Sequence, residues 1–416
     1  AGVINIITQQ SDKSLYAQAD LSTGNLGLAN LNMTVGGKLG KGKHLFRYRF
    51  WGGYQQMDDL NTKFDREFNY NPLTYDETGS YLDEPSYSGS IDSVGLGELP
   101  TESRYFGTDL SYRNWRFTYH YMGREYHSSI GLNPISSVYD QPGTLFAENI
   151  NSLNLSYTKA FSRLTLTSNL SYLNYRLDES SNYFSVFNYQ HPFFNYFYGA
   201  SDDIRFEQIA AFTFSPSISL VTGGTFQYSG NLPFTTYLDE PFDPDDYSPF
   251  STTSFRDEDD MPGPGGEDAT PFLIPDPITF SRYSLFAEWS FNFGNFSAQA
   301  GGRFDNNSEF GSTFSPRLGM TYRINDNHIL RGSFSMANRN PSSFHTYNTL
   351  ELRRVPRMGG PGDTLIYFPI VNDELTTERL ITGELGIRNF FSEDMTWDVS
   401  VYFNNNQDHF TFSLLD

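Results

Sequence analysis

The sequence of 416 residues contains no cysteine. Disulfide frameworks, thiolate metal sites and cysteine nucleophiles are therefore excluded. Long apolar runs are missing too, since no stretch approaches the ~18 consecutive apolar residues that a membrane-spanning helix needs. Basic residues are scarce: 28 Lys and Arg stand against 49 Asp and Glu, which gives a formal net charge of −21. Such a charge repels phosphate and argues against nucleic acid as a partner.

Aromatic residues, by contrast, are abundant. They make up 17% of the chain, while all hydrophobic residues together reach only 38%. Many of the rings alternate with polar residues along the chain. In 283–293 one set of alternate positions is Tyr, Leu, Ala, Trp, Phe and Phe, and the other set is Ser, Phe, Glu, Ser and Asn. This period of two predicts β-strands with one apolar and one polar face, and no segment shows a clear helical stripe of period 3.6.

The alternation predicts about fifteen strands. We place them at 15–23, 28–39, 43–56, 103–113, 115–128, 148–160, 162–177, 202–215, 217–230, 279–293, 295–308, 313–325, 328–340, 378–391 and 395–409. Several are longer than the ~5–6 residues typical of soluble sheets. They are long enough for a tilted transmembrane strand, which needs about 9–11 residues in the hydrocarbon.

The connections between these strands follow a pattern of short and long. From the second strand on, every second connection is a tight turn, as at 40–42, 113–114, 215–217 and 294–295. Most of the others are long: 57–102, 129–147, 178–201, 231–278 and 341–377. Short turns on one side and long loops on the other are typical of an outer-membrane barrel. We therefore predict an all-β fold, an antiparallel up-and-down transmembrane β-barrel with short periplasmic turns and long extracellular loops. A soluble propeller or β-helix is the alternative, but either would show a fixed internal repeat, which we do not find.

Three segments carry a family resemblance. The first is Ala-Gly-Val-Ile-Asn-Ile-Ile-Thr-Gln at 1–9, the second runs from Gly-Gly-Arg-Phe-Asp at 301–305 to Leu-Arg-Gly-Ser-Phe at 330–334, and the third is 375–388, with Gly-Glu-Leu-Gly-Ile-Arg at its end. In their order and spacing they resemble the TonB-dependent outer-membrane transporters, also called TonB-dependent receptors. The third segment departs from the family pattern, because threonine stands in place of the usual proline.

The resemblance implies how the chain is organised and what it does. Residues 1–10 would end a plug domain, and 11–416 would form part of the barrel, about fifteen of about 22 strands. The plug, with the segment that contacts the TonB complex of the inner membrane, would precede Ala1. We expect an importer in the outer membrane of a Gram-negative bacterium and not an enzyme, with no catalytic residues. Its other expected partners are outer-membrane lipid, lipopolysaccharide and a surface lipoprotein.

The resemblance leaves the transported solute open. A ferric siderophore or similar metal chelate is the first expectation, because it is the commonest assignment for such sequences. Oligosaccharides or peptides are the second. A barrel that anchors a surface adhesin or hydrolase is the third, and residues upstream of Ala1 that do not resemble a plug would favour it.

Polar alternate residues of a barrel face its lumen. This rule predicts lumen-facing charges at Arg47, Arg49, Arg116, Glu288, Arg317, Arg331, Glu384 and Arg388, together with His120, Arg323 and Asp398. By analogy with the family, they would contact the plug or line the route that opens when it moves. For each of these residues taken alone, we favour an ion pair between the barrel wall and the plug, with no role in the choice of solute.

Three loops supply candidate binding residues. The aromatic run at 178–201 offers Phe193, Phe194, Tyr196 and Tyr198, which would either stack on a solute or pack the loop onto its neighbours. The loop 341–377 offers Arg353, Arg354 and Arg357, whose guanidinium groups match carboxylate or phosphate. In the acidic loop 231–278, Asp243, Asp245 and Asp246 could bind Ca²⁺, although a charge run is more often a solvated loop. No cofactor is required, and the seven histidines form no metal-binding cluster.

Overall fold

The computed structural model describes most of the chain. The described residues are 13–58, 100–127, 137–138, 143–185, 193–232, 241–243, 278–342, 346, 349–356, 363–370, 375–392 and 395–409. Their regular structure is almost entirely β-strand, apart from one short 3₁₀ helix at Gly42–His44. Within this part of the chain, no helix is both long enough and apolar enough to cross a bilayer.

Fifteen strands form the main sheet, and they follow one another in chain order. They are β1 (Leu15–Thr23), β2 (Ala29–Leu39), β3 (Phe46–Met57), β4 (Thr101–Tyr112), β5 (Trp115–Tyr126), β7 (Phe146–Ala160), β8 (Leu164–Leu177), β11 (Ala200–Ser215), β12 (Ile218–Leu232), β13 (Ile278–Phe293), β14 (Phe296–Asn307), β15 (Gly311–Asn325), β16 (His328–Arg339), β19 (Glu378–Ser392) and β20 (Met395–Gln407). The number of strands, their order and nearly all their bounds confirm the all-β antiparallel prediction.

Five shorter strands lie in the long connections and were not predicted. They are β6 (Ser137–Val138), β9 (Asn182–Ser185), β10 (Phe193–Tyr196), β17 (Thr349–Pro356) and β18 (Asp363–Ile370). The first three form a small sheet, and the last two form a separate hairpin. The long connection 341–377 lies between β16 and β19 as predicted, and it contains a hairpin that was not predicted. Its apolar and charged residues do not alternate regularly, so the hairpin left no pattern to read.

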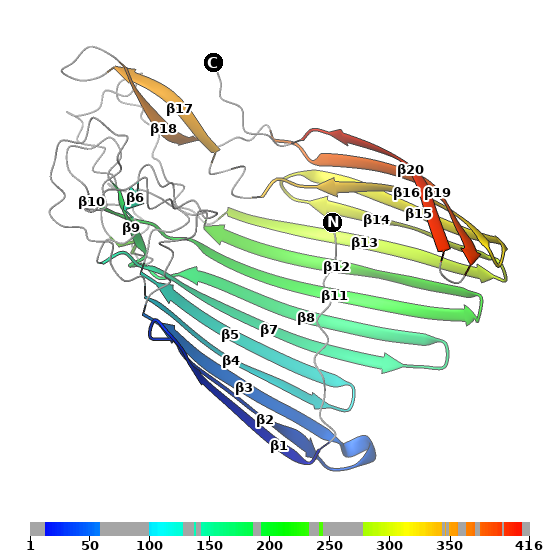
Figure 1. The fold of residues 1–416 in the computed structure, drawn as a ribbon, viewed down its shortest axis with the longest axis horizontal. Helices are drawn as coiled ribbons and strands as arrows, with labels where there is room; N and C mark the ends of the chain where they lie inside the picture. Colours follow the sequence, from blue (N-terminus) through cyan, green and yellow to red (C-terminus); the bar gives the residue numbers. More distant parts are fainter. Residues whose placement is uncertain are drawn as a thin grey trace. The chain divides into compact units, whose positions relative to one another are not determined.

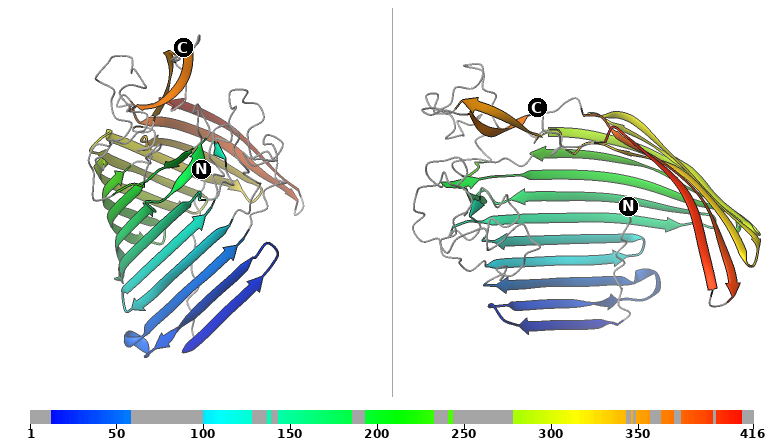
Figure 2. Two further views of the ribbon diagram at one scale, coloured as in Figure 1. Left: turned by 90° about the vertical axis from the view of Figure 1, so that its left-hand side faces the viewer. Right: turned by 45° about the horizontal axis from the view of Figure 1, so that its top comes forward.

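The chain divides into two compact units, which we describe separately. The first comprises 1–155, 172–201 and 234–261, and the second 156–171, 202–233 and 262–416. In each unit, neighbouring strands are joined by tight turns at one end, which we call the turn end (Figure 1). The other end, where the long connections join, is the loop end. The sheet of the second unit is twisted, so β19 and β20 run at an angle to β13 (Figure 2).

Residues that pair across neighbouring strands lie on the same face of a sheet, so the register shows which side chains share a face. In the first unit, one continuous row of pairs across β2–β5 is apolar: Leu39, Phe46, Tyr112 and Trp115. The adjacent row is polar and lies on the opposite face: Lys38, Arg47, Ser111 and Arg116. The first unit thus has an apolar face and a polar face.

The second unit repeats this arrangement over six strands. The row across β13–β16, β19 and β20 on its apolar face is Phe293, Phe296, Tyr322, Leu330, Ile387 and Val399. The adjacent row on its polar face is Asn292, Ser297, Thr321, Arg331, Gly386 and Ser400. A one-residue slip of register would exchange the two faces, so the alternation fixes the register strongly.

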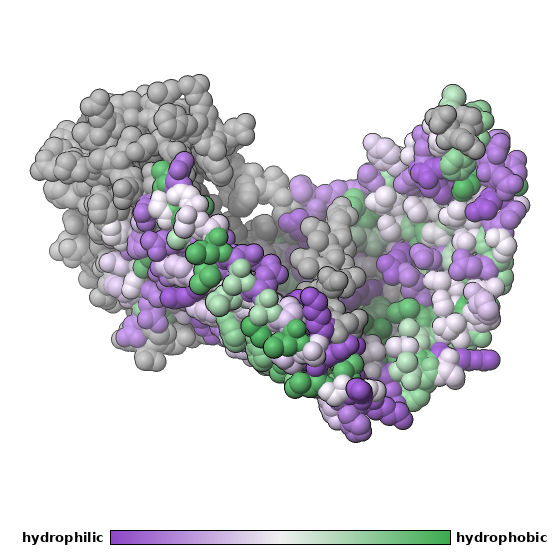
Figure 3. Space-filling view, turned by 60° about the horizontal axis from the view of Figure 1, so that its bottom comes forward, coloured by the Kyte–Doolittle hydropathy of each residue, from purple (hydrophilic) through white to green (hydrophobic). Residues whose placement is uncertain are grey.

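The apolar faces are open rather than packed. Leu21 of the first unit and Val401 of the second are 75% and 74% exposed. Hydrophobic residues gather in patches bordered by hydrophilic ones in the space-filling view (Figure 3). The few buried apolar side chains of the described residues lie in the long connections, as Phe197 and Phe242 do, or at the loop ends of strands, as Leu177 and Leu232 do. A water-soluble monomer rarely exposes this much contiguous apolar surface, which indicates that another apolar phase or a partner covers it.

Candidate functional site

The polar face of the second unit carries a set of ion pairs. Six arginines of β13–β16 and β19 each lie within 4.0 Å of a carboxylate, in the pairs Arg282–Asp305, Arg303–Asp305, Arg317–Glu288, Arg331–Glu384, Arg331–Asp398, Arg388–Asp398 and Arg339–Glu378. Arg323, near the turn end of β15, is exposed instead. All but one of these pairs join different strands, so they hold the polar side chains in defined positions across the sheet.

Asp305 is the centre of one such group. The Nε of Arg303 donates to both of its carboxylate oxygens, at 3.0 and 2.8 Å, and the Ser284 hydroxyl donates to it at 2.5 Å. Arg282 approaches the same carboxylate at 3.3 Å. The sequence analysis missed this group, although the alternation places all four residues on the polar face.

Asp398 is the centre of a second group, close to the turn end of β19 and β20. It accepts from Arg331 at 2.6 Å and from Arg388 at 2.8 Å, while Arg331 also donates to Glu384 at 3.3 Å. Four residues predicted to face the lumen are thus brought together in one network. Half-exposed pairs of this kind contribute modestly to stability, so positioning is their main effect.

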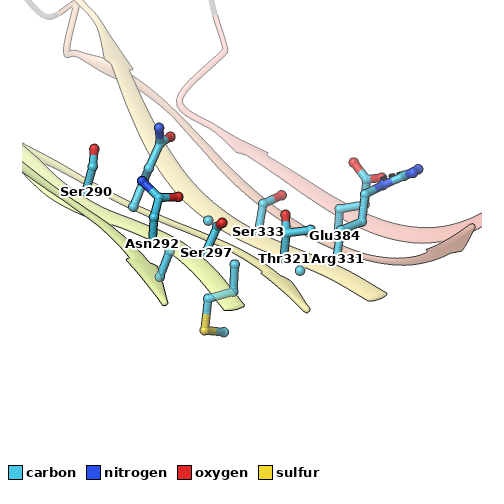
Figure 4. A pocket seen from close by; sticks show the side chains of 12 residues that line it. Ser290, Asn292, Ser297, Thr321, Arg331, Ser333 and Glu384 are labelled. Carbon is cyan, nitrogen blue, oxygen red and sulfur yellow. Dashed lines mark hydrogen bonds and ion pairs between the residues drawn. The ribbon is translucent and has the colours of Figure 1, made fainter. Parts of the chain in front are cut away.

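A polar depression of about 370 Å³ adjoins this network. Small hydroxyl and amide side chains line it, and the labelled residues project from one side of the strands with the Arg331–Glu384 pair at one end (Figure 4). Gly319 forms part of its lining and leaves it open, since a Cβ there would meet no atom within 4 Å. Hydroxyls and amides both donate and accept hydrogen bonds, so the depression suits a ligand rich in hydroxyl or amide groups.

The polar face of the first unit has a different arrangement. Arg116 donates two hydrogen bonds to the Asp109 carboxylate, at 3.1 and 2.6 Å, and Arg124 forms an ion pair with Glu148 at 2.6 Å. Arg47 and Arg49 have no carboxylate partner among the described residues, and the Nε of each is buried without a hydrogen bond.

Aromatic rings on this face lie over glycines of the neighbouring strand. A Cβ on Gly107 would come within 2.3 Å of the Trp51 ring, and one on Gly53 within 2.6 Å of the Tyr105 ring. Tyr105 in turn donates to Asn32 across Gly53. These glycines leave room for large rings to lie against the sheet. This packing also favours one register of the strands.

The residues predicted to face a lumen lie on the polar faces of the sheet. By register this holds for Arg47, Arg49, Arg116, Glu288, Arg317, Arg331, Glu384 and Arg388, and for His120 and Asp398. That these faces line a lumen stays a prediction. Seven of these ten take part in the ion pairs just described, and the other three are Arg47, Arg49 and His120. Whether any of them contacts a plug or a solute stays a prediction.

The predicted loop residues are only partly within the described chain. The side chains of Phe193, Phe194, Arg353 and Arg354, and all of Arg357, Asp245 and Asp246, lie outside it. Asp243 is exposed. Tyr196 is half-buried, and Tyr198 is buried with its ring stacked on Phe242 at 4.2 Å between centroids. For Tyr198 this contact favours loop packing over an open stacking surface.

Comparison with known proteins assigns this chain to a family. A model of the TonB-dependent receptor-like β-barrel matches residues 101–416. The chain belongs to the TonB-dependent receptor family. Members of this family are receptors and transporters of the Gram-negative outer membrane. No curated protein sequence matches the chain significantly.

Solved structures of TonB-dependent receptors share the fold. A variant of the ferric enterobactin receptor of Pseudomonas aeruginosa aligns with 98% of this chain and 55% of its own, at 15% identity and a TM-score of 0.60. The siderophore receptor PirA of Acinetobacter baumannii aligns with 97% of this chain and 54% of its own, at 13% identity and a TM-score of 0.55. The ferric yersiniabactin uptake receptor of Yersinia pestis aligns with 98% of this chain and 57% of its own, at 12% identity and a TM-score of 0.52. The chain thus spans little more than half the length of these receptors.

Proposed function

We propose that the chain forms part of the wall of a TonB-energised importer in the outer membrane of a Gram-negative bacterium, and that a ferric siderophore or similar metal chelate is the imported solute. Family membership carries the transport proposal. The solute class is supported by the similar structures, which are receptors for ferric enterobactin, ferric yersiniabactin and other siderophores.

The two faces of the sheet suit this function. Lipid would cover the apolar face, because exposed residues such as Leu21 and Val401 gain free energy when they leave water. The polar face, with its ion pairs, would then line the lumen, as polar residues do in outer-membrane barrels. Capture of the solute by the extracellular loops and energy transfer from TonB follow from the family and not from any contact within this chain.

The polar depression near Arg331 favours a second candidate, the import of oligosaccharides or peptides. Its lining of serine, threonine, asparagine and glutamine side chains offers many hydrogen-bond donors and acceptors. Sugars and peptides present the matching hydroxyl and amide groups.

Uptake by cells separates the two candidates. The full-length protein would be produced in a Gram-negative strain that lacks its own siderophore receptors, with and without TonB. We expect accumulation of ⁵⁵Fe from at least one ferric siderophore in a panel, only when TonB is present. TonB-dependent uptake of a labelled oligosaccharide or peptide without iron uptake would establish the second candidate. Uptake of neither, with the protein in the outer membrane, would contradict both.

A further inference from the structure

One cluster on the polar face of the first unit holds more arginines than carboxylates among the described residues. It consists of Arg47 and Arg49 on β3, Asp109 on β4 and Arg116 on β5. The register pairs Arg49 directly with Asp109 and brings Arg47 into one row with Arg116, separated by Ser111. Three guanidinium groups therefore share a small area with one carboxylate.

Among the described residues, only Arg116 forms an ion pair with the carboxylate of Asp109. Two short hydrogen bonds, at 3.1 and 2.6 Å, hold the pair together, and the Asp109 side chain is only 9% exposed. Arg49 therefore gains no ion pair from its register partner. The Nε atoms of Arg47 and Arg49 are buried without a hydrogen bond. A buried donor without a partner costs free energy, which an acceptor at this place would recover.

The guanidinium of Arg49 is held in place rather than free. It lies over the Trp51 ring at 4.5 Å, and the same ring stands 5.0 Å from the His120 ring. Gly107 makes room for Trp51 on the sheet, as a Cβ there would meet the ring. Because the side chain is already ordered, a ligand that binds it pays less conformational entropy.

We propose that Arg47 and Arg49 form an oxyanion-binding subsite on the polar face, with Arg116 at its border. The ligand is a carboxylate or phosphate group, because the guanidinium fork donates two parallel hydrogen bonds to such groups. The oxyanion comes from one of two sources, a free anionic solute or an acidic side chain elsewhere in the full-length protein. The subsite is independent of which solute the protein imports.

Citrate titration of the full-length protein in detergent, at constant ionic strength, tests the subsite. Trp51 is one of four tryptophans, so its fluorescence is isolated by subtracting the Trp51→Phe variant. We expect a saturable change in this signal, with the affinity at least tenfold weaker in Arg49→Gln. Arg317→Gln is the matched control, because Arg317 already pairs with Glu288 and its loss leaves the subsite intact. Asp109→Asn releases Arg116 and should tighten citrate binding several-fold.

The thermal unfolding midpoint of the same proteins distinguishes the two sources. If an acidic side chain of the protein fills the subsite, citrate leaves the wild-type signal unchanged, and Arg49→Gln lowers the midpoint more than Arg49→Lys does. If a free anion fills it, citrate raises the midpoint of the wild type but not that of Arg49→Gln. Equal citrate affinity in wild type and Arg49→Gln would overturn the proposal. So would the absence of both a citrate response and a midpoint change. A failed uptake experiment would leave the subsite standing.

Discussion

The polar faces of the two units hold their arginines in different ways. In the second unit, six arginines of β13–β16 and β19 each have a carboxylate within 4.0 Å, and two carboxylates, Asp305 and Asp398, are each shared by two arginines. In the first unit, two of the four polar-face arginines, Arg47 and Arg49, have no carboxylate among the described residues. Apart from Arg323, the second face pairs these arginines with its own carboxylates, while the first presents the positive charge of Arg47 and Arg49 to whatever lies against it.

The difference has a packing side as well as an electrostatic one. Near Arg49 the first unit uses a large ring, Trp51, laid over Gly107. The second unit uses small hydroxyl and amide side chains, which leave an open polar depression around Gly319. A sheet can thus hold an arginine side chain in place either with a carboxylate or with an aromatic ring. Only the aromatic ring leaves the positive charge of the arginine free to bind an anion.

The largest expected effect comes from adding one methyl group to each face. Gly107→Ala would place a Cβ 2.3 Å from the Trp51 ring and displace it, so we expect a loss of about 1–3 kcal/mol in the free energy of unfolding. Gly319→Ala meets nothing within 4 Å and should be neutral or slightly stabilising, because alanine loses less backbone entropy than glycine. Urea unfolding of the full-length protein measures both. Equal losses in the two variants would remove the packing difference between the units.

A smaller effect should follow when the second unit is made to resemble the first. Asp398→Asn removes the carboxylate shared by Arg331 and Arg388, so Arg388 loses its partner while Arg331 keeps Glu384. We expect a thermal unfolding midpoint a few degrees lower at low salt, partly restored by citrate. The same variant at 1 M salt is the control, since exposed ion pairs are strongly screened there. A midpoint that does not change at low salt would show that compensation of charge does not matter in this unit.

The smallest expected effect is a pH dependence at the loop end of the second unit, outside the membrane-spanning segments. Hydrogen bonds from His409 and Asn406 hold the pKa of Glu378 below its usual range, and Arg339 adds to this. Since the pKa is lower in the folded state, the stabilisation is complete above the ordinary carboxyl pKa of ~4.3 and is lost as the pH falls through the lowered value.

Hydrogen exchange of the β19–β20 loop end, followed between pH 7 and pH 3, measures this dependence after correction for the intrinsic exchange rate. Glu378→Gln should remove the extra opening at low pH. In the first unit, the Glu148 pair with Arg124 at the loop end is the matched comparison. An identical pH profile in wild type and Glu378→Gln would contradict the assignment.

Most of the fold could be predicted from the sequence. The alternation of residues predicted fifteen strands and the face of each side chain, because a one-residue slip would turn the whole apolar set to the other face, and the short and long connections predicted the strand order. The hairpin β17–β18 could not be predicted, since its apolar and charged residues do not alternate regularly.

The site could be predicted less completely. Arg47, Arg317 and Arg331 were all expected on the polar face, but the alternation treats them alike. Which arginine receives a carboxylate depends on the register between strands far apart in sequence, as with Arg331 and Asp398. Asp109 was missed for the same reason, because only its position opposite Arg49 and diagonal to Arg116 shows its role.

The central claim is that one face of this wall meets lipid and the other meets water. The 416 residues contain no cysteine, so single labels can be introduced without background from this chain. Ser333 and Phe334 are neighbours on β16 with opposite faces, and both are exposed. Nitroxide labels on Ser333→Cys and Phe334→Cys, in the full-length protein in bilayers, should report water-soluble nickel chelate at position 333 and oxygen from the lipid at position 334. Equal access of the nickel chelate at both positions would contradict the account.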